Sequence, residues 1–63
     1  MTGKERREKL LQMLTDSEEP LSGRALAGAL GVSRQVIVQD IALLRASDQH
    51  ISPTSSGYLL TKK

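Results

Sequence analysis

Apolar residues recur at helical spacing in three segments of this chain, which cover residues 4–17, 23–30 and 34–46. Their positions follow the i, i+3, i+4, i+7 spacing of amphipathic helices, in which one face is buried against a core. The predicted core positions are Leu10, Met13, Leu14, Leu26, Ala27, Leu30, Ile37, Ile41 and Leu44. The pattern therefore predicts three short helices that share one core.

Turn signals separate these predicted helices. Pro20 disfavours helical geometry at the residue before it, so the first connection falls at residues 16–21. Ser22 and Ser33 each stand just before a helix, where a side-chain oxygen can accept a hydrogen bond from the first turn. Gly31 stands just past a helix end, where a positive φ is favoured. We therefore expect a tight turn at residues 31–33, between the second and third helices.

Beyond the third helix the pattern changes to two short β-capable runs. They are HISPT at residues 50–54 and GYLLT at residues 57–61, separated by a turn at Ser55–Gly57. Pro53 suits an edge strand, because proline cannot donate a backbone hydrogen bond. A chain of 63 residues can build one small core. We therefore expect one domain over residues 1–63, mainly helical with a small β-hairpin.

The spacing of residues around the predicted turn is that of a helix-turn-helix motif. Ala27 allows two helices to approach closely, Gly31 accepts a left-handed conformation, and Ile37 attaches the second helix of the motif to the core. Asp40 stands where the simplest form of the motif has an apolar residue, and Ile41 supplies that contact instead. Together with the hairpin, this spacing predicts a winged helix-turn-helix of three helices and a two-stranded wing.

The outward face of the third helix is the candidate binding surface. At 100° per residue, the positions that point away from the core are Gln35, Val38, Gln39, Ala42 and Ala46. This face is small and polar without a central carboxylate, so it suits the major groove of double-stranded DNA. Gln39, and secondly Gln35, can donate to and accept from adenine in parallel, while Val38 and Ala42 can contact a thymine methyl group.

The ends of this helix and the hairpin tip supply candidate phosphate contacts. Ser33 and Arg34 begin the helix, where the dipole favours anions, and Arg45 lies in its last turn. Ser55 and Ser56 form the tip of the wing. Each residue also has a plainer interpretation: Ser33 as a cap, the arginines as solvated helix surface, and the two serines as turn residues.

Two charged features are open to more than one interpretation. Residues 4–9 alternate basic side chains with Glu5 and Glu8, so they form either a phosphate-facing arm or a helix surface of mixed charge. Asp40 is expected to pair with Arg45 or to cap a neighbouring helix. A contact of Asp40 with DNA is disfavoured, because phosphates repel a carboxylate.

Composition narrows the function classes. Lys and Arg number 9 against 7 Asp and Glu, and the net charge of +2 permits a polyanionic partner. There is no cysteine, and His50 is the only histidine, so we expect no metal or cofactor in this domain. No nucleophile–base arrangement is recognisable, and we expect no enzymatic activity. No apolar run approaches the ~18 residues of a membrane span, so we expect a cytoplasmic protein without a membrane partner.

A family resemblance rests on the stretch LSGRALAGALGVSRQVIVQDIALLR at residues 21–45, followed by GYLL at residues 57–60. It resembles the N-terminal winged-helix domain of biotin-repressor-like regulators. Within that group it is most similar to the niacin-responsive transcriptional repressors, which control genes of NAD biosynthesis and niacin uptake. The resemblance implies that Ser33, Arg34, Gln35 and Gln39 belong to a DNA-recognition helix. The wing tip at Ser55–Gly57 lacks the basic residue that such repressors often carry.

The resemblance also implies partners and further parts. Similar full-length repressors carry a C-terminal domain with histidines, which binds a metal ion and nicotinic acid and supports a homodimer. We therefore expect an N-terminal fragment of a bacterial repressor whose partner is double-stranded DNA, with the oligomeric state of the isolated domain open. Two alternatives remain: a winged helix that serves as a protein–protein interaction module, and a biotin-repressor-type or other metabolite-responsive regulator.

Overall fold

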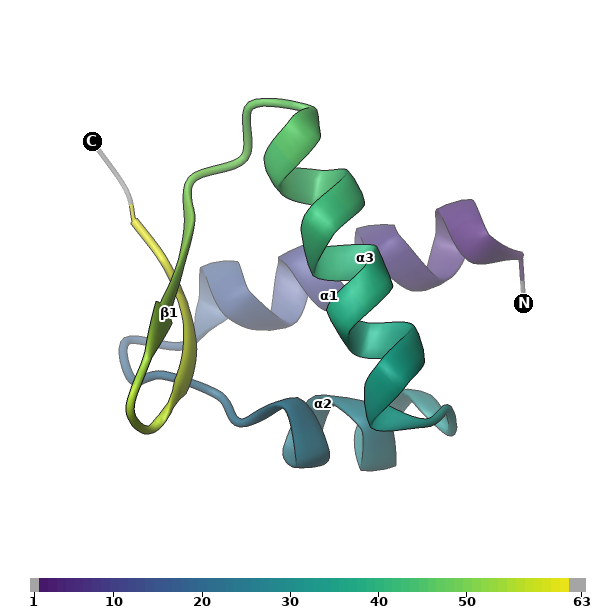
Figure 1. Cartoon of the computed structure of the whole chain (residues 1–63), viewed down its shortest axis with the longest axis horizontal. Helices are drawn as coiled ribbons and strands as arrows, with labels where there is room; N and C mark the ends of the chain where they lie inside the picture. The colour runs from purple at the N-terminus through teal and green to yellow at the C-terminus, as the bar shows by residue number, and fades with distance from the viewer. Residues whose placement is uncertain (1, 62–63) are drawn as a thin grey trace.

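Three helices followed by a β-hairpin make up the computed structural model, which describes residues 2–61 (Figure 1). The elements are α1 (Gly3–Asp16), α2 (Gly23–Leu30), α3 (Arg34–Ala46), β1 (Ile51–Thr54) and β2 (Gly57–Leu60). In Figure 1, α3 crosses in front of α1, and the hairpin stands beside both. The predicted fold class is confirmed, and the bounds of the elements differ from the predicted ones by one residue at most.

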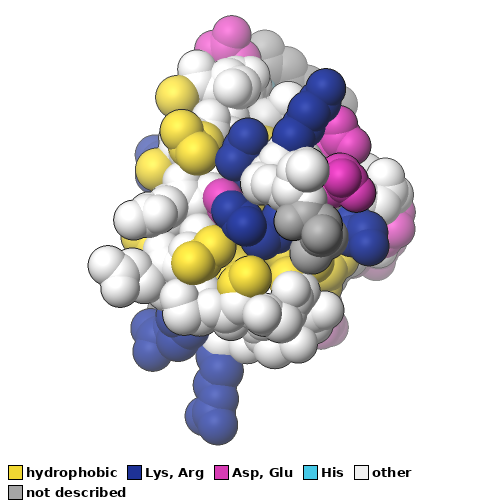
Figure 2. Space-filling view, turned by 90° about the vertical axis from the view of Figure 1, so that its right-hand side faces the viewer, with side chains coloured by type: hydrophobic (Ala, Val, Ile, Leu, Met, Phe, Trp, Pro, Cys, Tyr) yellow, Lys and Arg dark blue, Asp and Glu magenta, His cyan; other side chains and the backbone are white. Residues whose placement is uncertain are grey.

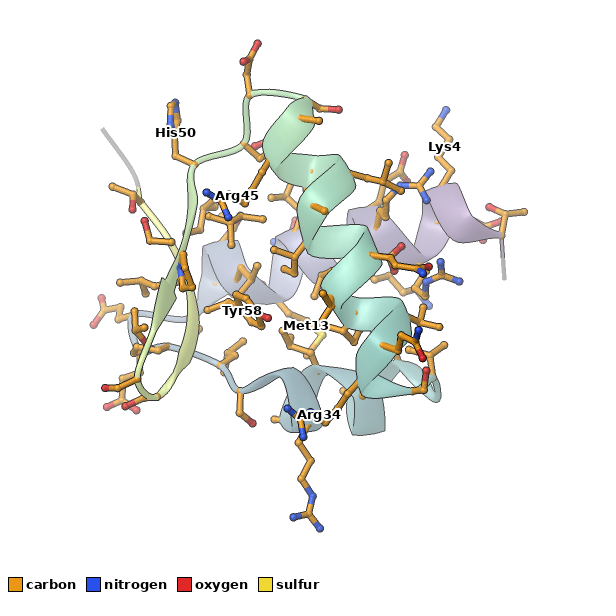
Figure 3. The ribbon with its side chains drawn as sticks, in the orientation of Figure 1. Lys4, Met13, Arg34, Arg45, His50 and Tyr58 are labelled. Carbon is orange, nitrogen blue, oxygen red and sulfur yellow. The ribbon has the colours of Figure 1, made fainter. Side chains whose placement is uncertain are left out.

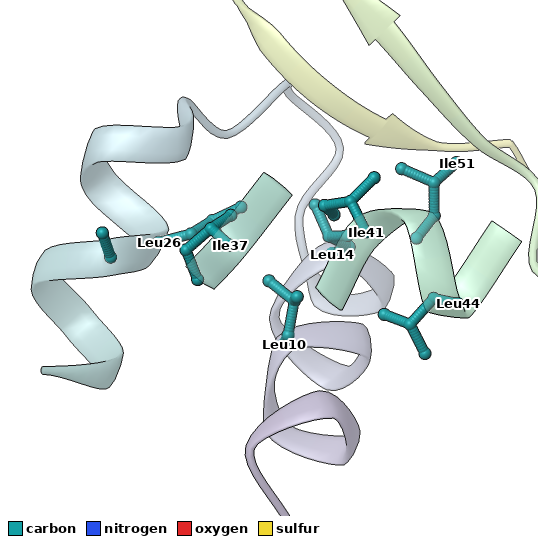
Figure 4. Close-up of a cluster of buried hydrophobic side chains, with 8 residues drawn as sticks. Leu10, Leu14, Leu26, Ile37, Ile41, Leu44 and Ile51 are labelled. Atoms are coloured by element: carbon teal, nitrogen blue, oxygen red, sulfur yellow. The ribbon is translucent and has the colours of Figure 1, made fainter. Parts of the chain in front are cut away.

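Buried apolar side chains form a core that joins all three helices to β1 (Figure 4). They are Leu10, Leu14, Leu26, Ala27, Ile37, Ile41, Leu44 and Ile51. The predicted core is confirmed, except that Met13 and Leu30 are half-buried at its edge. Each fully buried Leu or Ile contributes about 1.5–3 kcal/mol, whereas helices this short are marginal alone in water. The helices therefore depend on one another for stability.

The turn between α2 and α3 has the geometry that its glycine and serine predict. Gly31 is left-handed, with φ 69° and ψ 34°, and the Val32 N–H donates to the Ala27 carbonyl oxygen at 3.0 Å. The Ser33 hydroxyl then caps α3 by accepting from the Val36 N–H at 3.3 Å. The two helices meet at 102°, within the range of about 90–120° typical of helix-turn-helix pairs.

The hairpin is attached to the connection between α1 and α2, a contact that the hydrophobic pattern does not predict. Leu21 and Tyr58 exchange two backbone hydrogen bonds, with N···O distances of 2.9 and 2.8 Å. β2 therefore has a partner on each side, and β1 is the edge strand, as Pro53 predicts. The turn is Ser55–Ser56, one residue shorter than predicted, because Gly57 already begins β2.

Gly57 is required by this attachment. Its φ is 143°, a conformation that side chains other than hydrogen rarely allow. A Cβ atom at this position would overlap the carbonyl group of Leu21 and the backbone nitrogen of Ser22. Any larger residue would therefore have to move the hairpin away from the start of α2.

Gly31→Ala is expected to lower the free energy of unfolding by about 1 kcal/mol, because alanine is strained at positive φ. Gly28→Ala is the matched control, since at both positions nothing lies within 4 Å of the added Cβ atom. Gly28 lies inside α2, where alanine favours the helix, so we expect an increase of about 0.5–1 kcal/mol. Urea unfolding followed by circular dichroism measures both values. Changes of the same sign would contradict the turn geometry.

Gly57→Ala is expected to lower the free energy of unfolding by about 2 kcal/mol, because it combines an unfavourable φ with a backbone overlap. It should also speed hydrogen exchange at the Leu21 amide, which donates to Tyr58. The control is Ser55→Ala at the exposed turn, for which we expect a change below ~0.5 kcal/mol. An unaltered Leu21 amide in Gly57→Ala would contradict the attachment of the hairpin.

Candidate nucleic-acid interface

The outward face of α3 is exposed along its whole length. All five residues predicted to point away from the core are exposed, and Val38 retains 53% of its accessible surface. These residues are Gln35, Val38, Gln39, Ala42 and Ala46. The opposite side of the helix is buried through Ile37, Ile41 and Leu44. No other part of the described chain covers the two glutamines, so this face is available to a partner.

Basic side chains lie at both ends of α3. Arg34 is exposed in the first turn, at the end of α3 nearest α2, and Arg45 is exposed in the last turn, between α3 and the hairpin (Figure 3). Ser33, which precedes Arg34, is exposed, and its hydroxyl is already used as the N-cap. The side chains predicted to hold phosphates at the helix ends are therefore accessible.

An open groove of about 290 Å³ separates α3 from the hairpin. Its walls come from the start of α2, one flank of α3 and the wing. The lining residues are Ser22, Gly23, Arg34, Val38, Pro53, Thr54, Ser55, Ser56, Gly57 and Tyr58. The groove brings four predicted site residues together, namely Arg34, Val38, Ser55 and Ser56. It does not include Ser33, Gln35, Gln39, Ala42 or Arg45, which lie outside it on the helix or at its ends.

Six lining residues were not predicted as part of the site: Ser22, Gly23, Pro53, Thr54, Gly57 and Tyr58. The Ser22 hydroxyl caps α2 by accepting from the Ala25 N–H at 3.0 Å, so the positive end of this helix borders the groove. The spacing of the sequence predicts Ser22 as a helix cap. Its position beside the hairpin depends on the pairing of Leu21 with Tyr58, for which the sequence carries no local signal.

Asp40 is the one buried charged side chain among the described residues, with 1% of its surface exposed. Its partner is Arg6 of α1, which donates from Nε to Oδ2 at 2.5 Å and from Nη2 to Oδ1 at 3.0 Å. Arg7 adds a longer ion pair at 3.8 Å. The expected pairing of Asp40 with Arg45, or a role as a helix cap, is therefore wrong. Asp40 lies on the flank of α3 that faces α1, whereas Arg45 is exposed towards the hairpin.

This ion pair also changes the interpretation of the basic N-terminal segment. Arg6 and Arg7 are half-buried, with 22% and 31% of their side-chain surfaces exposed, so they are not a free phosphate-binding arm. The hydrogen bond to Asp40 raises the pKa of Arg6, which stays charged at any working pH. Figure 2 shows acidic and basic side chains mixed on this side of the molecule. The mixed-charge interpretation of the segment is the better one.

A sequence signal for this pair exists in retrospect. Arg6 continues the buried stripe of Leu10 and Leu14 by one turn towards the N-terminus, and Asp40 stands between Ile37 and Ile41 on the core side of α3. Arg6 and Asp40 are thus charges of opposite sign on two stripes that are otherwise apolar. Because buried charges are usually paired, these two residues are candidates for an ion pair across the core. The pattern cannot show that these two edges meet.

Two other kinds of site find no support among residues 2–61. No group of three or more His, Asp or Glu side chains in this range is placed to hold a metal ion, and His50 is exposed. No single helix in the same range has the length and apolar character needed to cross a membrane.

The fold and this surface define the class: a helix-turn-helix domain with a hairpin wing, whose last helix presents an uncovered face with two glutamines beside a groove. Residues 6–59 match a family model described as an HTH domain, and the chain belongs to this family. The transcription repressor NadR of Bacillus subtilis is 51% identical over 59 residues, which are 94% of this chain and 33% of NadR. The probable transcription repressor NiaR of Thermotoga maritima is 52% identical over 56 residues, 89% of this chain and 32% of NiaR. The chain spans about a third of the length of these curated relatives.

Proposed function

We propose that this chain is the double-stranded DNA-binding domain of a bacterial transcription repressor that inserts α3 into the major groove. The observation that carries the proposal is the exposed face of α3, which bears two glutamines and no carboxylate. A helix about 10–12 Å wide fits a major groove about 12 Å wide. Membership of the HTH family and similarity to two transcription repressors support the same role.

Base contacts are assigned to the outward face. Gln39 lies near the middle of this face, where its amide can pair with the N6 and N7 atoms of adenine, and Gln35 lies one turn earlier. Val38 and Ala42 are the aliphatic neighbours that can contact thymine methyl groups. These four residues would provide the sequence preference, because contacts to base edges specify sequence and phosphate contacts do not.

Phosphate contacts are assigned to the borders of this face. Ser33 and Arg34 lie where the N-terminal end of α3 favours an anion, and Arg45 lies at the other end. Arg34 lines the groove between α3 and the wing together with Ser55 and Ser56, whose hydroxyls can donate to a phosphate. The wing tip carries no basic residue, so its contribution to affinity would be small.

The regulated genes are proposed to be those of niacin and NAD metabolism, on the strength of the family resemblance and the repressors to which the chain is similar. A metal ion and nicotinic acid would then bind to residues outside this chain. A single module of this size buries a small DNA interface. Tight binding would therefore need two copies on a two-fold operator, as in a homodimer.

Binding to random duplex DNA at two salt concentrations tests the proposal. With Arg34 and Arg45 each neutralising one phosphate, the affinity is expected to fall roughly tenfold between 50 and 200 mM salt, because bound counterions are released. Arg34→Gln should reduce the salt slope by about one, while the exposed Lys9→Gln on α1 is the control and should change it less. A protein–protein interaction module would bind no duplex at either concentration, and that result would reject the proposal.

Gln39→Ala is expected to lower the preference for a selected duplex over random DNA by about tenfold, because one amide pair is lost to a base. The selected duplex is the one that the native chain recovers from a random library. The affinity of the Gln39→Ala variant for random DNA should stay nearly the same as that of the native chain. Gln12→Ala on the exposed surface of α1 is the matched control. Equal losses of affinity on both duplexes would contradict a base contact by Gln39.

A further inference from the structure

We infer that the Arg6–Asp40 ion pair positions α3 by setting its rotation about its own axis, and so takes part in sequence discrimination without touching DNA. The effect on sequence discrimination rests on the proposed function, whereas the positioning of α3 is a property of the free domain. Arg6 and Asp40 are positioning residues in this sense. Neither belongs to the face assigned to base contacts.

The apolar contacts of α3 determine which side of the helix is buried, but they contain no contact of fixed direction. Ile37, Ile41 and Leu44 form a narrow stripe against the core, and apolar contact is non-directional. A rotation of about 20° moves a side-chain tip ~6 Å from the helix axis by about 2 Å. That displacement exceeds the spread of about 0.5 Å within which hydrogen-bond distances fall. The glutamines therefore need a more directional constraint than the stripe provides.

The ion pair has the geometry that provides such a constraint. Two hydrogen bonds, 2.5 and 3.0 Å long, join separate nitrogens of Arg6 to separate oxygens of Asp40, so both the distance and the plane of the carboxylate are fixed. Asp40 follows Val38 by two residues, about 200° around the helix. Val38 faces the hairpin groove, and Asp40 faces α1. The pair therefore holds the flank of α3 opposite the wing.

Stability alone does not explain a buried carboxylate at this position. Replacing a buried ion pair by apolar side chains of similar size is often neutral or stabilising, because burial removes water from both charges. Asp40 lies beside Ile37 and Ile41, where an aliphatic residue would extend the apolar stripe. The ion pair adds a contact of fixed geometry, which the apolar stripe does not provide.

The test is the double variant Arg6→Met/Asp40→Leu, which removes one charge of each sign and leaves the net charge unchanged. We expect it to fold, to bind random duplex with nearly native affinity, and to lose about tenfold of its preference for the selected duplex. In the free protein, amide residual dipolar couplings should show α3 turned or mobile relative to α1 and α2. Glu8→Gln/Lys9→Gln removes the same charges from the exposed surface of α1 and should change neither measurement.

The residual dipolar couplings are measured on the free protein, without DNA. They therefore test this inference separately from the proposed function. Native orientation and native order of α3 in the double variant would overturn the inference. Full discrimination by a variant whose α3 has turned would also overturn it. Should the double variant fail to fold, Asp40→Asn keeps the shape of the side chain and removes its charge, and the same two measurements decide. Absence of DNA binding by the native chain would reject the proposed function alone.

Discussion

The burial of one side of α3 against α1 and α2 is the interaction on which the rest of this domain depends. Ile37 and Ile41 enter a core built by Leu10, Leu14 and Leu26, and none of these helices is long enough to be stable alone. Because side chains spaced at 3.6 residues per turn can bury only one side of a helix, the same contact leaves the opposite side free. The binding face is in this way a direct result of core formation.

The two flanks of α3 meet different structures, and each contributes to the candidate interface. On one flank, the pairing of Leu21 with Tyr58 brings the hairpin beside the helix and forms the groove, and Gly57 allows that close approach. On the other flank, Arg6 and Asp40 join α3 to α1. A helix with one open face, a groove on one side and a directional contact on the other suits insertion into a DNA groove.

A small core also limits what such a domain does alone. The chain forms one layer of contacts among three helices and a hairpin, and the groove beside α3 is open to solvent. Its proposed DNA contacts are few, so sequence preference and affinity would both increase when two copies bind together.

The amino-acid sequence by itself determined the three helices, the turn at Gly31, the caps at Ser22 and Ser33, and the exposure of the two glutamines on α3. These features follow from spacing and conformational preference within a few residues, so they can be predicted locally. Only the tertiary structure decided the partner of Asp40, which lies 34 residues from Arg6, and the attachment of Tyr58 to Leu21. The physical reason is that the packing of the core brings distant segments together, and the sequence around each residue does not specify its partner.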